Sequence, residues 1–487
     1  MPFRRSAPTP LALAALVAAA FVVPLALAAD AARAPHAAVK PSGTSIVTLT
    51  TGVVDGKMVF LDEQGKPNPK LKAKLGDTLE IRISSGEGAQ HDIVIPSFNV
   101  ASAKFDKASG ATKVRFKVTK AGTFEYYCTI AGHRQIGMEG VLEVSGAASA
   151  AAAASPQARA QPAAKPPAVD AARPDAVSVA MNPNAVPAPL AKRPPQTVTY
   201  RIETVEVDGK LDDGTTFTYW TFDKKVPGPM LRVRKGDRIQ LTLANAKDSK
   251  MIHSIDLHAT TGPGGGAAFL QVPPGQEKTI SFKAMSPGLY VYHCATPSVA
   301  EHISAGMYGM ILVEPENGLP RVDREFYVMQ GDIYTKHRTG TKGHQPFDHD
   351  KLAAELPDYF VFNGTTGALT KEHKMQAKVG ETVRIYFGVG GPNKTSSFHV
   401  IGEIFDRVYT EASTSAPREN VQTTSVPPGG AAIVEFKVEY PGKYVLVDHA
   451  LSRAGKGALG ILEVTGKADP AVYHDHGDSP KDAMMAH

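Results

Sequence analysis

A cysteine, two histidines and a methionine occur twice in this chain at short and similar spacings. The first set is Cys128, His133 and Met138, with His91 upstream. A thiolate, two imidazoles and a weak axial thioether form the ligand set of a blue, or type 1, copper centre, whose geometry suits one-electron transfer. The sequence therefore predicts a type 1 copper site at these four residues.

The second set repeats this pattern with Cys294, His302 and Met307, and with His253 upstream. The chain has only two cysteines, so in an oxidising compartment a disulfide between them is the alternative. Because each cysteine has its own histidine and methionine at short spacing, we favour metal ligation over the disulfide. The chain is thus expected to hold two type 1 coppers.

Two further histidines adjoin the second set. His258 follows His253 by five positions, and His293 directly precedes the second cysteine. Side chains alternate between the two faces of a strand, so an odd separation places two residues on opposite faces. His258 and His293 should therefore point away from the type 1 site towards a second metal, with Asp256 on the same face as His258. In the first set Tyr127 replaces the histidine before the cysteine, so that region should hold type 1 copper alone.

Two imidazoles are an incomplete set for a catalytic metal, which typically has three protein ligands and an open position. A third region without cysteine offers His449 and His399. A single histidine in an apolar strand is usually structural. Because the metal site of the second region lacks a third ligand, we favour a ligand role here instead. We expect this third region to complete the second metal site.

These residues lie within a phrase that occurs three times: a turn with glycine, a short strand, a potential ligand and a closing strand. The copies span 121–144, 287–314 and 441–464, and His449 lies at the corresponding point of the third. From Ser45 onward, short runs rich in Val, Ile, Thr, Phe and Tyr are separated by Gly, Pro, Asp and Asn, which is typical of β-sandwiches. Three homologous β-domains are predicted.

The composition divides the 487 residues further. A basic start followed by an apolar run that ends in small residues predicts a signal peptide cleaved after Ala28. The mature chain is therefore expected to be periplasmic and to have no membrane span. Export by either the general or the twin-arginine route remains open. The net charge of +5 is modest and its Lys and Arg residues are scattered, so nucleic-acid binding is not expected. The predicted parts are a signal peptide (1–28), a first domain (40–146), a mobile Ala/Pro-rich linker (147–195), a second domain (196–316), a third domain (317–467) and a C-terminal tail (468–487).

The region from about Thr197 to Lys467 resembles the copper-containing nitrite reductases. The phrases that carry the resemblance are His253-Ser254-Ile255-Asp256-Leu257-His258, Tyr292-His293-Cys294-Ala295, Gly306-Met307-Tyr308-Gly309, Ser397-Phe398-His399-Val400-Ile401-Gly402 and Val447-Asp448-His449. The spacing of seven residues between Cys294 and His302 is similar to that of the more compact class of these enzymes. The first domain resembles the plastocyanin and pseudoazurin branch of the cupredoxins, and its fusion to the rest is similar to a known extended variant.

This resemblance implies an all-β chain of three cupredoxin-like Greek-key β-sandwiches, the second and third packed as a catalytic core. It implies reduction of nitrite to nitric oxide in a homotrimer, with two type 1 coppers and one type 2 copper per chain and active sites at subunit interfaces. The type 2 ligands would be His258, His293 and His449, the last from a neighbouring subunit. Asp256 and His399 would handle protons, and Ile401 would shape the substrate pocket.

One departure from the family pattern lies at Gln422-Thr423, where many relatives carry Glu-Thr. Thr423 is expected to position His399 in spite of it. The electron donor implied by the family is a small periplasmic cytochrome c or cupredoxin. The first domain would act either as a built-in electron-transfer module or as a stabiliser of the trimer.

Two other functions compete with this interpretation. A two-domain multicopper oxidase needs a trinuclear cluster fed by several His-x-His pairs and a His-Cys-His phrase, whereas this chain has His-Cys-Ala, and its one His-x-His pair, His474-Asp475-His476, lies in the tail. A non-enzymatic carrier with several cupredoxin domains would leave His258, His293 and the third-domain histidines unexplained. The number of coppers per chain distinguishes the three.

Overall fold

Strands dominate the chain, and many of them alternate buried and exposed side chains as half-buried strands do. The computed structural model describes residues 43–54, 57–130, 133–134, 137–146 and 169–474. The expected signal peptide, the first part of the expected linker and the end of the tail lie outside the described residues. No helix of the described ranges is long and apolar enough to cross a membrane.

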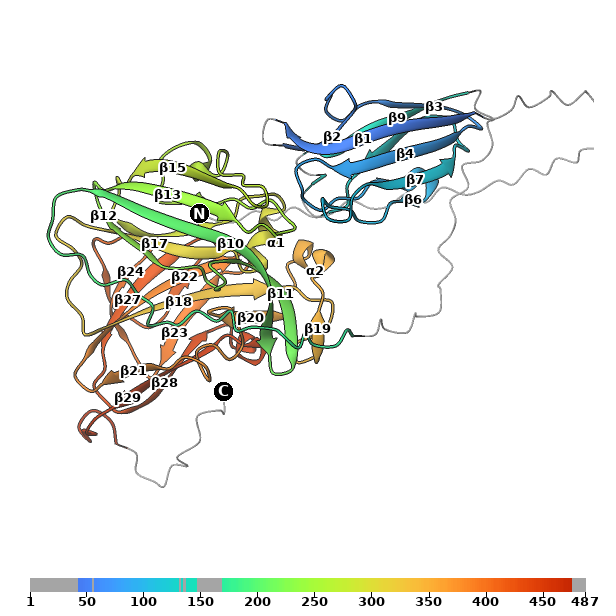
Figure 1. Cartoon of the computed structure of the whole chain (residues 1–487). Coiled ribbons are helices and arrows are strands. Elements are labelled where there is room, and N and C mark those ends of the chain that lie inside the picture. The colour runs from blue at the N-terminus through green and yellow to red at the C-terminus, as the bar shows by residue number, and fades with distance from the viewer. Residues whose placement is uncertain (1–42, 55–56, 131–132, 135–136, 147–168, 475–487) are drawn as a thin grey trace, which may run out of the picture. The chain divides into compact units, whose positions relative to one another are not determined.

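Residues 43–146 form a sandwich of two sheets, drawn in blue in Figure 1. The first sheet has the order β2-β1-β4-β7 and the second the order β3-β9-β8-β5-β6. Apolar side chains of both sheets fill the space between them, among them Phe60, Ile81 and Leu142, all fully buried. The elements are β1 (Thr44–Val54), β2 (Lys57–Leu61), β3 (Leu71–Lys74), β4 (Thr78–Ser85), β5 (Val94–Ile95), η1 (Pro96–Phe98), β6 (Val100–Ala101), β7 (Thr112–Lys117), β8 (Gly122–Tyr127) and β9 (Glu139–Ser145).

A second sandwich follows, with sheet orders β15-β13-β10-β11-β19 and β12-β17-β16-β14. Its second sheet carries the predicted ligands, because β14 and β16 lie side by side in antiparallel register. The elements are β10 (Thr197–Asp212), β11 (Thr215–Phe222), β12 (Leu231–Arg234), β13 (Arg238–Asn245), β14 (Asp256–Leu257), η2 (Pro263–Gly266), β15 (Glu277–Lys283), β16 (Gly288–His293), α1 (Val299–Ser304) and β17 (Tyr308–Glu314).

The third sandwich has the sheet orders β20-β18-β22-β27-β24-β25 and β21-β29-β28-β23-β26. The all-β class and the three cupredoxin-like sandwiches predicted from the sequence are confirmed. The elements are β18 (Arg324–Ile333), β19 (Gly343–Gln345), α2 (His349–Ala353), β20 (Tyr359–Phe362), β21 (Met375–Lys378), β22 (Thr382–Gly391), β23 (Ser396–Ile401), β24 (Phe405–Tyr409), β25 (Arg418–Val421), β26 (Thr424–Val426), β27 (Ala431–Lys437), β28 (Gly442–Asp448), η3 (Leu451–Lys456) and β29 (Leu459–Thr465).

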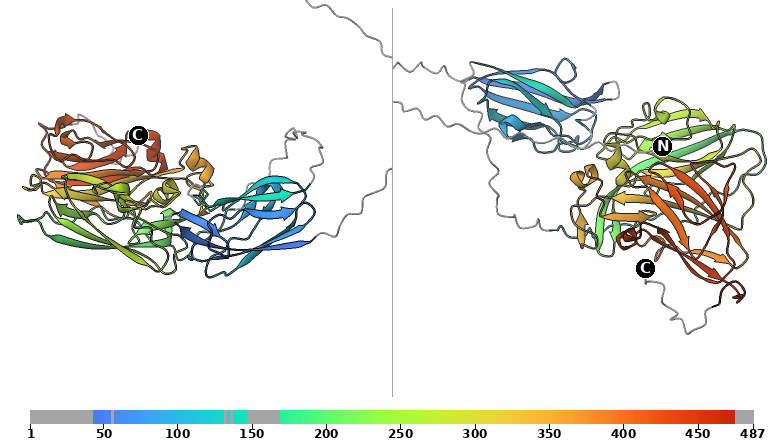
Figure 2. Two further views of the ribbon diagram at one scale, coloured as in Figure 1. Left: turned by 90° about the horizontal axis from the view of Figure 1, so that it is seen from above. Right: turned by 180° about the vertical axis from the view of Figure 1, so that it is seen from behind.

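The second and third sandwiches share a core, and Figure 2 shows them packed against each other in both views. A cluster of buried side chains joins residues of the two, including Tyr219 and Met310 from one and Met329 and Tyr386 from the other. The chain also crosses between them, because β19 pairs in parallel with β11. These two sandwiches therefore form one structural unit.

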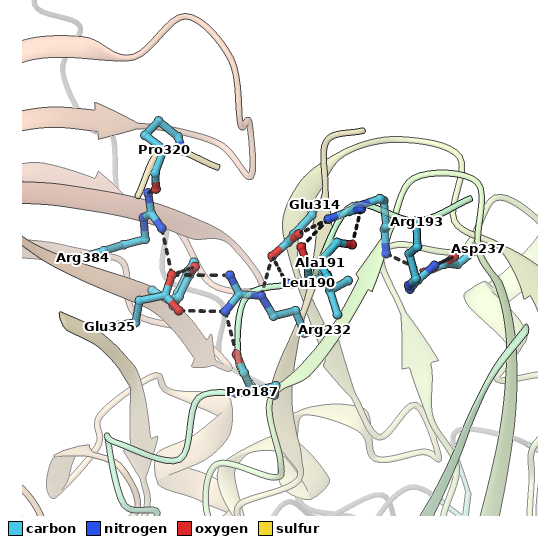
Figure 3. Close-up of polar contacts among 12 residues, drawn as sticks. Pro187, Leu190, Ala191, Arg193, Arg232, Asp237, Glu314, Pro320, Glu325 and Arg384 are labelled. Atoms are coloured by element: carbon cyan, nitrogen blue, oxygen red, sulfur yellow. Dashed lines mark hydrogen bonds and ion pairs between the residues drawn. The ribbon is translucent and has the colours of Figure 1, made fainter. Parts of the chain in front are cut away.

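Buried ion pairs reinforce the same seam (Figure 3). Arg232 on β12 contacts Glu314 with Nε at 2.6 Å and Glu325 of the third sandwich with Nη1 at 2.7 Å. Arg384 on β22 contacts Glu325 at 2.8 Å and Glu435 at 2.5 Å. Because each buried charge has an opposite charge within hydrogen-bonding distance, removing one partner would leave an uncompensated charge in the interior.

Residues 169–195 are not the mobile linker that their Ala/Pro content predicts. Val179 and Ala180 in this segment are fully buried, and the N–H of Met181 donates to the carbonyl of Val226 at 3.1 Å. Arginines of β12 hold its carbonyl groups: Arg232 donates to Pro187 at 2.6 Å, and Arg234 donates to Leu190 and Ala191 at 2.7 Å each. The segment lacks periodicity because it is held by partners distant in sequence rather than by a ladder of its own.

Candidate copper sites

The loop between β16 and β17 carries three of the predicted ligands of the second sandwich. Cys294 directly follows the strand, His302 lies on α1, and Met307 directly precedes the next strand. Backbone bonds close the loop, since the N–H of Met307 donates to the His302 carbonyl and the N–H of Cys294 donates to the Met307 carbonyl, both at 3.1 Å. The strand pair therefore returns the methionine beside the cysteine.

The ligand atoms of this set converge in a fully buried space. Cys294 Sγ lies 3.2 Å from His302 Nδ1, and His253 Nδ1 lies 3.3 Å from the same atom. All three side chains and Met307 have no exposed surface. Ser254 donates its backbone N–H to the sulfur at 3.3 Å. Two nitrogens and a sulfur that face one another at these distances fit a cation between them.

The charges around this set favour the thiolate. Burial opposes ionisation of the Cys294 thiol, but the imidazoles of His302 and His253 outweigh it and hold the pKa of Cys294 well below its usual value. Burial also opposes protonation of His253, whereas hydrogen bonds to Cys294 and Glu206 raise its pKa to about 9. Glu206 Oε1 lies 3.4 Å from His253 Nε2, on the far side of the ring from the sulfur, where a partner fixes the orientation of a metal-binding imidazole.

The first sandwich brings its predicted set together in a similar way. Cys128 Sγ lies 3.5 Å from His133 Nδ1, and the rings of His91 and His133 lie 4.9 Å apart between centroids. Nε2 of His91 contacts Glu87, which leaves Nδ1 of His91 buried with no hydrogen-bond partner among the described residues. Met138 is fully buried. An orphaned imidazole nitrogen beside a buried thiol fits a copper ligand set.

A second cluster lies on the other side of β16. Asp256 on β14 pairs directly with His293. His258 Nε2 lies 3.1 Å from His293 Nε2, and the ligand atoms of Asp256, His258 and His293 all lie within 4.8 Å of one another. Burial, and then the neighbouring His293, lower the pKa of His258, which favours the neutral imidazole that a metal requires.

The third sandwich holds its predicted residues in a separate group. The rings of His399 and His449 lie 5.6 Å apart between centroids, and His449 is exposed at the end of β28. Ile401 ends β23 and is half-buried. Within the described part of one chain, no metal-sized cluster unites His449 with His258 and His293. One chain therefore brings His258 and His293 together and holds His449 in a separate group.

The partner of His399 is a residue to which the sequence assigned no role. His399 Nδ1 lies 2.7 Å from the carbonyl oxygen of Gln422. Thr423, which the sequence suggested for this role, makes no hydrogen bond to His399 among the described residues, and it is half-buried. A backbone carbonyl is independent of residue type, so the departure from Glu at position 422 leaves this contact intact.

Asp448 is a second residue that the sequence did not indicate. Cys128, Cys294 and Asp448 each lie six residues after the turn glycine of their phrase, so the aspartate, not His449, takes the place of the cysteines. Asp448 is fully buried and accepts hydrogen bonds from the backbone N–H groups of Ser397 and Ala450, both at 3.1 Å. Its carboxylate also accepts a hydrogen bond from the side chain of Gln330 at 3.0 Å and forms an ion pair with Arg453. These bonds fix the turn that carries His449.

Comparison with known proteins assigns the core. Two family models match, both described as multicopper oxidase, at residues 203–318 and 340–467. A copper-containing nitrite reductase of Neisseria meningitidis is 55% identical over 288 residues, which are 59% of this chain and 74% of that protein. The chain belongs to the copper-containing nitrite reductases. Another reductase of this family, from Pseudomonas chlororaphis, is 36% identical over 57% of this chain and 81% of its own length.

A solved structure supports the same assignment. The copper nitrite reductase of Nitrosomonas europaea matches with a TM-score of 0.51 and 36% identity, over 56% of this chain and 96% of that one. The protein is thus a copper-containing enzyme, as predicted. Neither family model falls on the sandwich of residues 43–146, so the role of that sandwich rests on its own residues.

Proposed function

We propose that this reductase converts nitrite to nitric oxide at a type 2 copper held by His258, His293 and His449 of the partner subunit. His253, Cys294, His302 and Met307 hold the type 1 copper that supplies the electron. The reaction consumes one electron and two protons per nitrite and yields nitric oxide and water. A homotrimer with its active sites at the subunit interfaces completes each site, because one chain presents only half of it.

The observation that carries this proposal is the alternation of side chains across the end of β16. Cys294 is fully buried in one cluster, while the adjacent His293 reaches the other cluster, 3.1 Å from His258. A single peptide therefore links the two groups of ligands covalently. A pure electron carrier has no use for the second group.

Copper, when bound, supplies one-electron redox chemistry and an open position for an anionic ligand. The protein residues supply the protons. Asp256 lies beside the His258–His293 pair and donates one proton, and His399 of the partner subunit donates the other while its Nδ1 is held at the Gln422 carbonyl. Both act as general acids, so activity should fall towards alkaline pH. Ile401 shapes the substrate pocket.

The test is an anaerobic assay for nitric oxide from nitrite, with electron paramagnetic resonance and copper analysis on the same sample. We expect nitric oxide, a type 2 signal and three coppers per chain, two of them type 1. A trinuclear cluster would give more copper, and a carrier would give two coppers and no type 2 signal. Absence of a type 2 signal in copper-replete protein would contradict the proposed site.

Asp256→Asn tests the proton donor separately. We expect roughly a 100-fold lower kcat, in line with the loss of a general acid, with the type 2 signal retained. Full turnover by this variant with copper bound would show that Asp256 has no role in proton delivery.

The first sandwich, with His91, Cys128, His133 and Met138, is proposed as an electron-transfer module. Because residues 169–195 lie against the core, the informative truncation begins at Val169 rather than near Pro195. A lower rate with a protein donor and an unchanged trimer would support electron transfer. An unchanged rate with a weakened trimer would instead assign the sandwich to assembly.

The chain is proposed to be exported to the periplasm after cleavage at Ala28 and to accept electrons there from a small cytochrome c or cupredoxin. The apolar segment before Ala28 and the electron-transfer sites support this proposal. Mass spectrometry of the mature protein and fractionation of the cells test it. A mature chain that retains residues 1–28 in the cytoplasm would contradict it.

A further inference from the structure

A glycine-rich turn follows β14 and lies against Asp256 of the Asp256–His258–His293 cluster. Its residues are Gly262, Pro263, Gly264, Gly265 and Gly266. Gly264 has φ of 64° and ψ of 23°, and Gly265 has φ of 54° and ψ of 17°, so both occupy the left-handed region. Glycine adopts this region without steric cost, whereas other residues rarely do. The backbone conformation alone accounts for glycine at either position.

Gly265 carries a second constraint that Gly264 lacks. A Cβ added at Gly265 would lie 1.8 Å from Oδ1 of Asp256 and 2.8 Å from its Cγ. A Cβ added at Gly264 would have only the Cβ of Ala268 in its vicinity, at 3.8 Å. The backbone of Gly265 therefore lies directly against the carboxylate of Asp256, so that any side chain at position 265 requires the carboxylate to move.

The Asp256 carboxylate has little else to fix its orientation. No hydrogen bond from a described residue holds it, although its backbone is fixed by pairing with His293. By contrast, His399 across the proposed site has its Gln422 carbonyl at 2.7 Å. Where no hydrogen bond from the protein fixes a carboxylate, neighbouring atoms that exclude it from other positions limit its orientation, and Gly265 is such a boundary.

We propose that Gly265 is a positioning residue, whose backbone holds the Asp256 carboxylate towards the His258–His293 pair. The inference rests on the proposed function of Asp256 as a proton donor. A side chain at position 265 would force the carboxylate to another rotamer, so the acid would remain in the protein but would no longer face the substrate. Misplacement of a reacting group by about 1 Å can cost roughly 100-fold in rate.

The test compares Gly265→Ala with the matched control Gly264→Ala, which introduces the same side chain at a similar positive φ in the same turn. We expect Gly265→Ala to lower kcat roughly 100-fold and Gly264→Ala to stay within about twofold of wild type. Copper content and the type 2 signal should be retained in both. The change that nitrite causes in the type 2 signal of the resting enzyme should be altered only in Gly265→Ala.

A double-mutant cycle with Asp256→Asn shows whether Gly265 acts through the carboxylate. If it does, Gly265→Ala should cause no further loss in the Asp256→Asn background. Equal activity of the two glycine variants, or losses that multiply in the double mutant, would overturn the inference. If Asp256→Asn itself keeps full turnover, the proposed function of Asp256 fails instead, so the two failures are distinguishable.

Asp256→Glu provides a second test should Gly265→Ala not fold. It retains the acid but adds a methylene group against the same backbone, so it should lose activity as Asp256→Asn does. Near-wild-type activity of Asp256→Glu would show that the turn does not restrict the carboxylate and would overturn the inference.

Discussion

The first and second sandwiches place a cysteine at the same point of the fold but differ on the opposite face of the strand. Val94 pairs with Tyr127 in the first, and Asp256 pairs with His293 in the second. The residue after each of these strands is the buried cysteine. One face of the strand end thus gives the same cluster in both sandwiches. The other face carries an apolar residue and a phenol in the first sandwich, and an acid and an imidazole in the second. The side chains of this second face therefore distinguish a site proposed to transfer electrons alone from one proposed to adjoin the reaction centre.

The loops of the two sites show where length can vary. The N–H of Cys128 donates to the Met138 carbonyl at 3.2 Å, and the N–H of Met138 donates to the His133 carbonyl at 2.9 Å. The second sandwich has the same two bonds, although its loop is longer and contains α1. The extra residues lie between the cysteine and the histidine, where they do not disturb the backbone bonds that return the methionine.

The thiols of the two sites differ in their electrostatic surroundings. Burial raises the pKa of Cys128 to about 12, whereas the histidines around Cys294 lower its pKa in spite of burial. The second site has its ligand atoms closer together, with 3.2 Å between sulfur and imidazole instead of 3.5 Å. The surroundings of Cys294 therefore favour the thiolate in advance of the metal.

Replacing each cysteine in turn should give the largest difference in turnover between the two sites. Cys294→Ala leaves the peptide bond to His293 intact but removes the thiolate through which that peptide would join the type 1 copper. It should lower turnover with a small-molecule reductant at least roughly 100-fold, since a type 1 centre needs its thiolate. Cys128→Ala should stay within about threefold under the same conditions. Turnover is measured together with the blue absorption, which should fall to about half in each variant. Equal losses of turnover would contradict the separation of roles.

Asp448 extends the comparison to the third copy, where an acid takes the place of the cysteine. Asp448→Asn keeps the size of the side chain but removes the charge that pairs with Arg453. We expect the turn of His449 to loosen, with roughly tenfold weaker binding of type 2 copper, as for a lost partner behind a metal ligand. The type 1 signals of the same sample are the internal control. A simultaneous loss of type 1 copper would indicate general unfolding instead.

The fold class and the pairing of ligands could be predicted because they follow from local rules. Strand alternation assigned His293 and Cys294 to opposite faces from their adjacency alone. Partners that are distant in sequence could not be predicted in this way, among them Glu206 behind His253 and the Gln422 carbonyl behind His399. A carbonyl has no signature in the sequence, because every residue carries one.

The segment of residues 169–195 failed as a prediction for a related reason. Its Ala and Pro content resembles that of a linker, but its carbonyl groups are held by Arg232 and Arg234, some 40 positions further along. Composition reports what a segment can do alone, and this segment is ordered by another part of the chain.

Tyr127→His should have the smallest effect. It tests which residues the face opposite the cysteine needs in order to bind a second metal. It introduces an imidazole before Cys128, at the place that His293 takes before Cys294. Val94 and Pro96 occupy the positions that correspond to Asp256 and His258, so the new imidazole would have neither a second nitrogen ligand nor an acid beside it. Because a catalytic metal site typically needs three protein ligands, we expect no new type 2 signal and no change in turnover. An additional type 2 signal would show that a single imidazole suffices and that the missing histidine, rather than the whole face, distinguishes the two sandwiches.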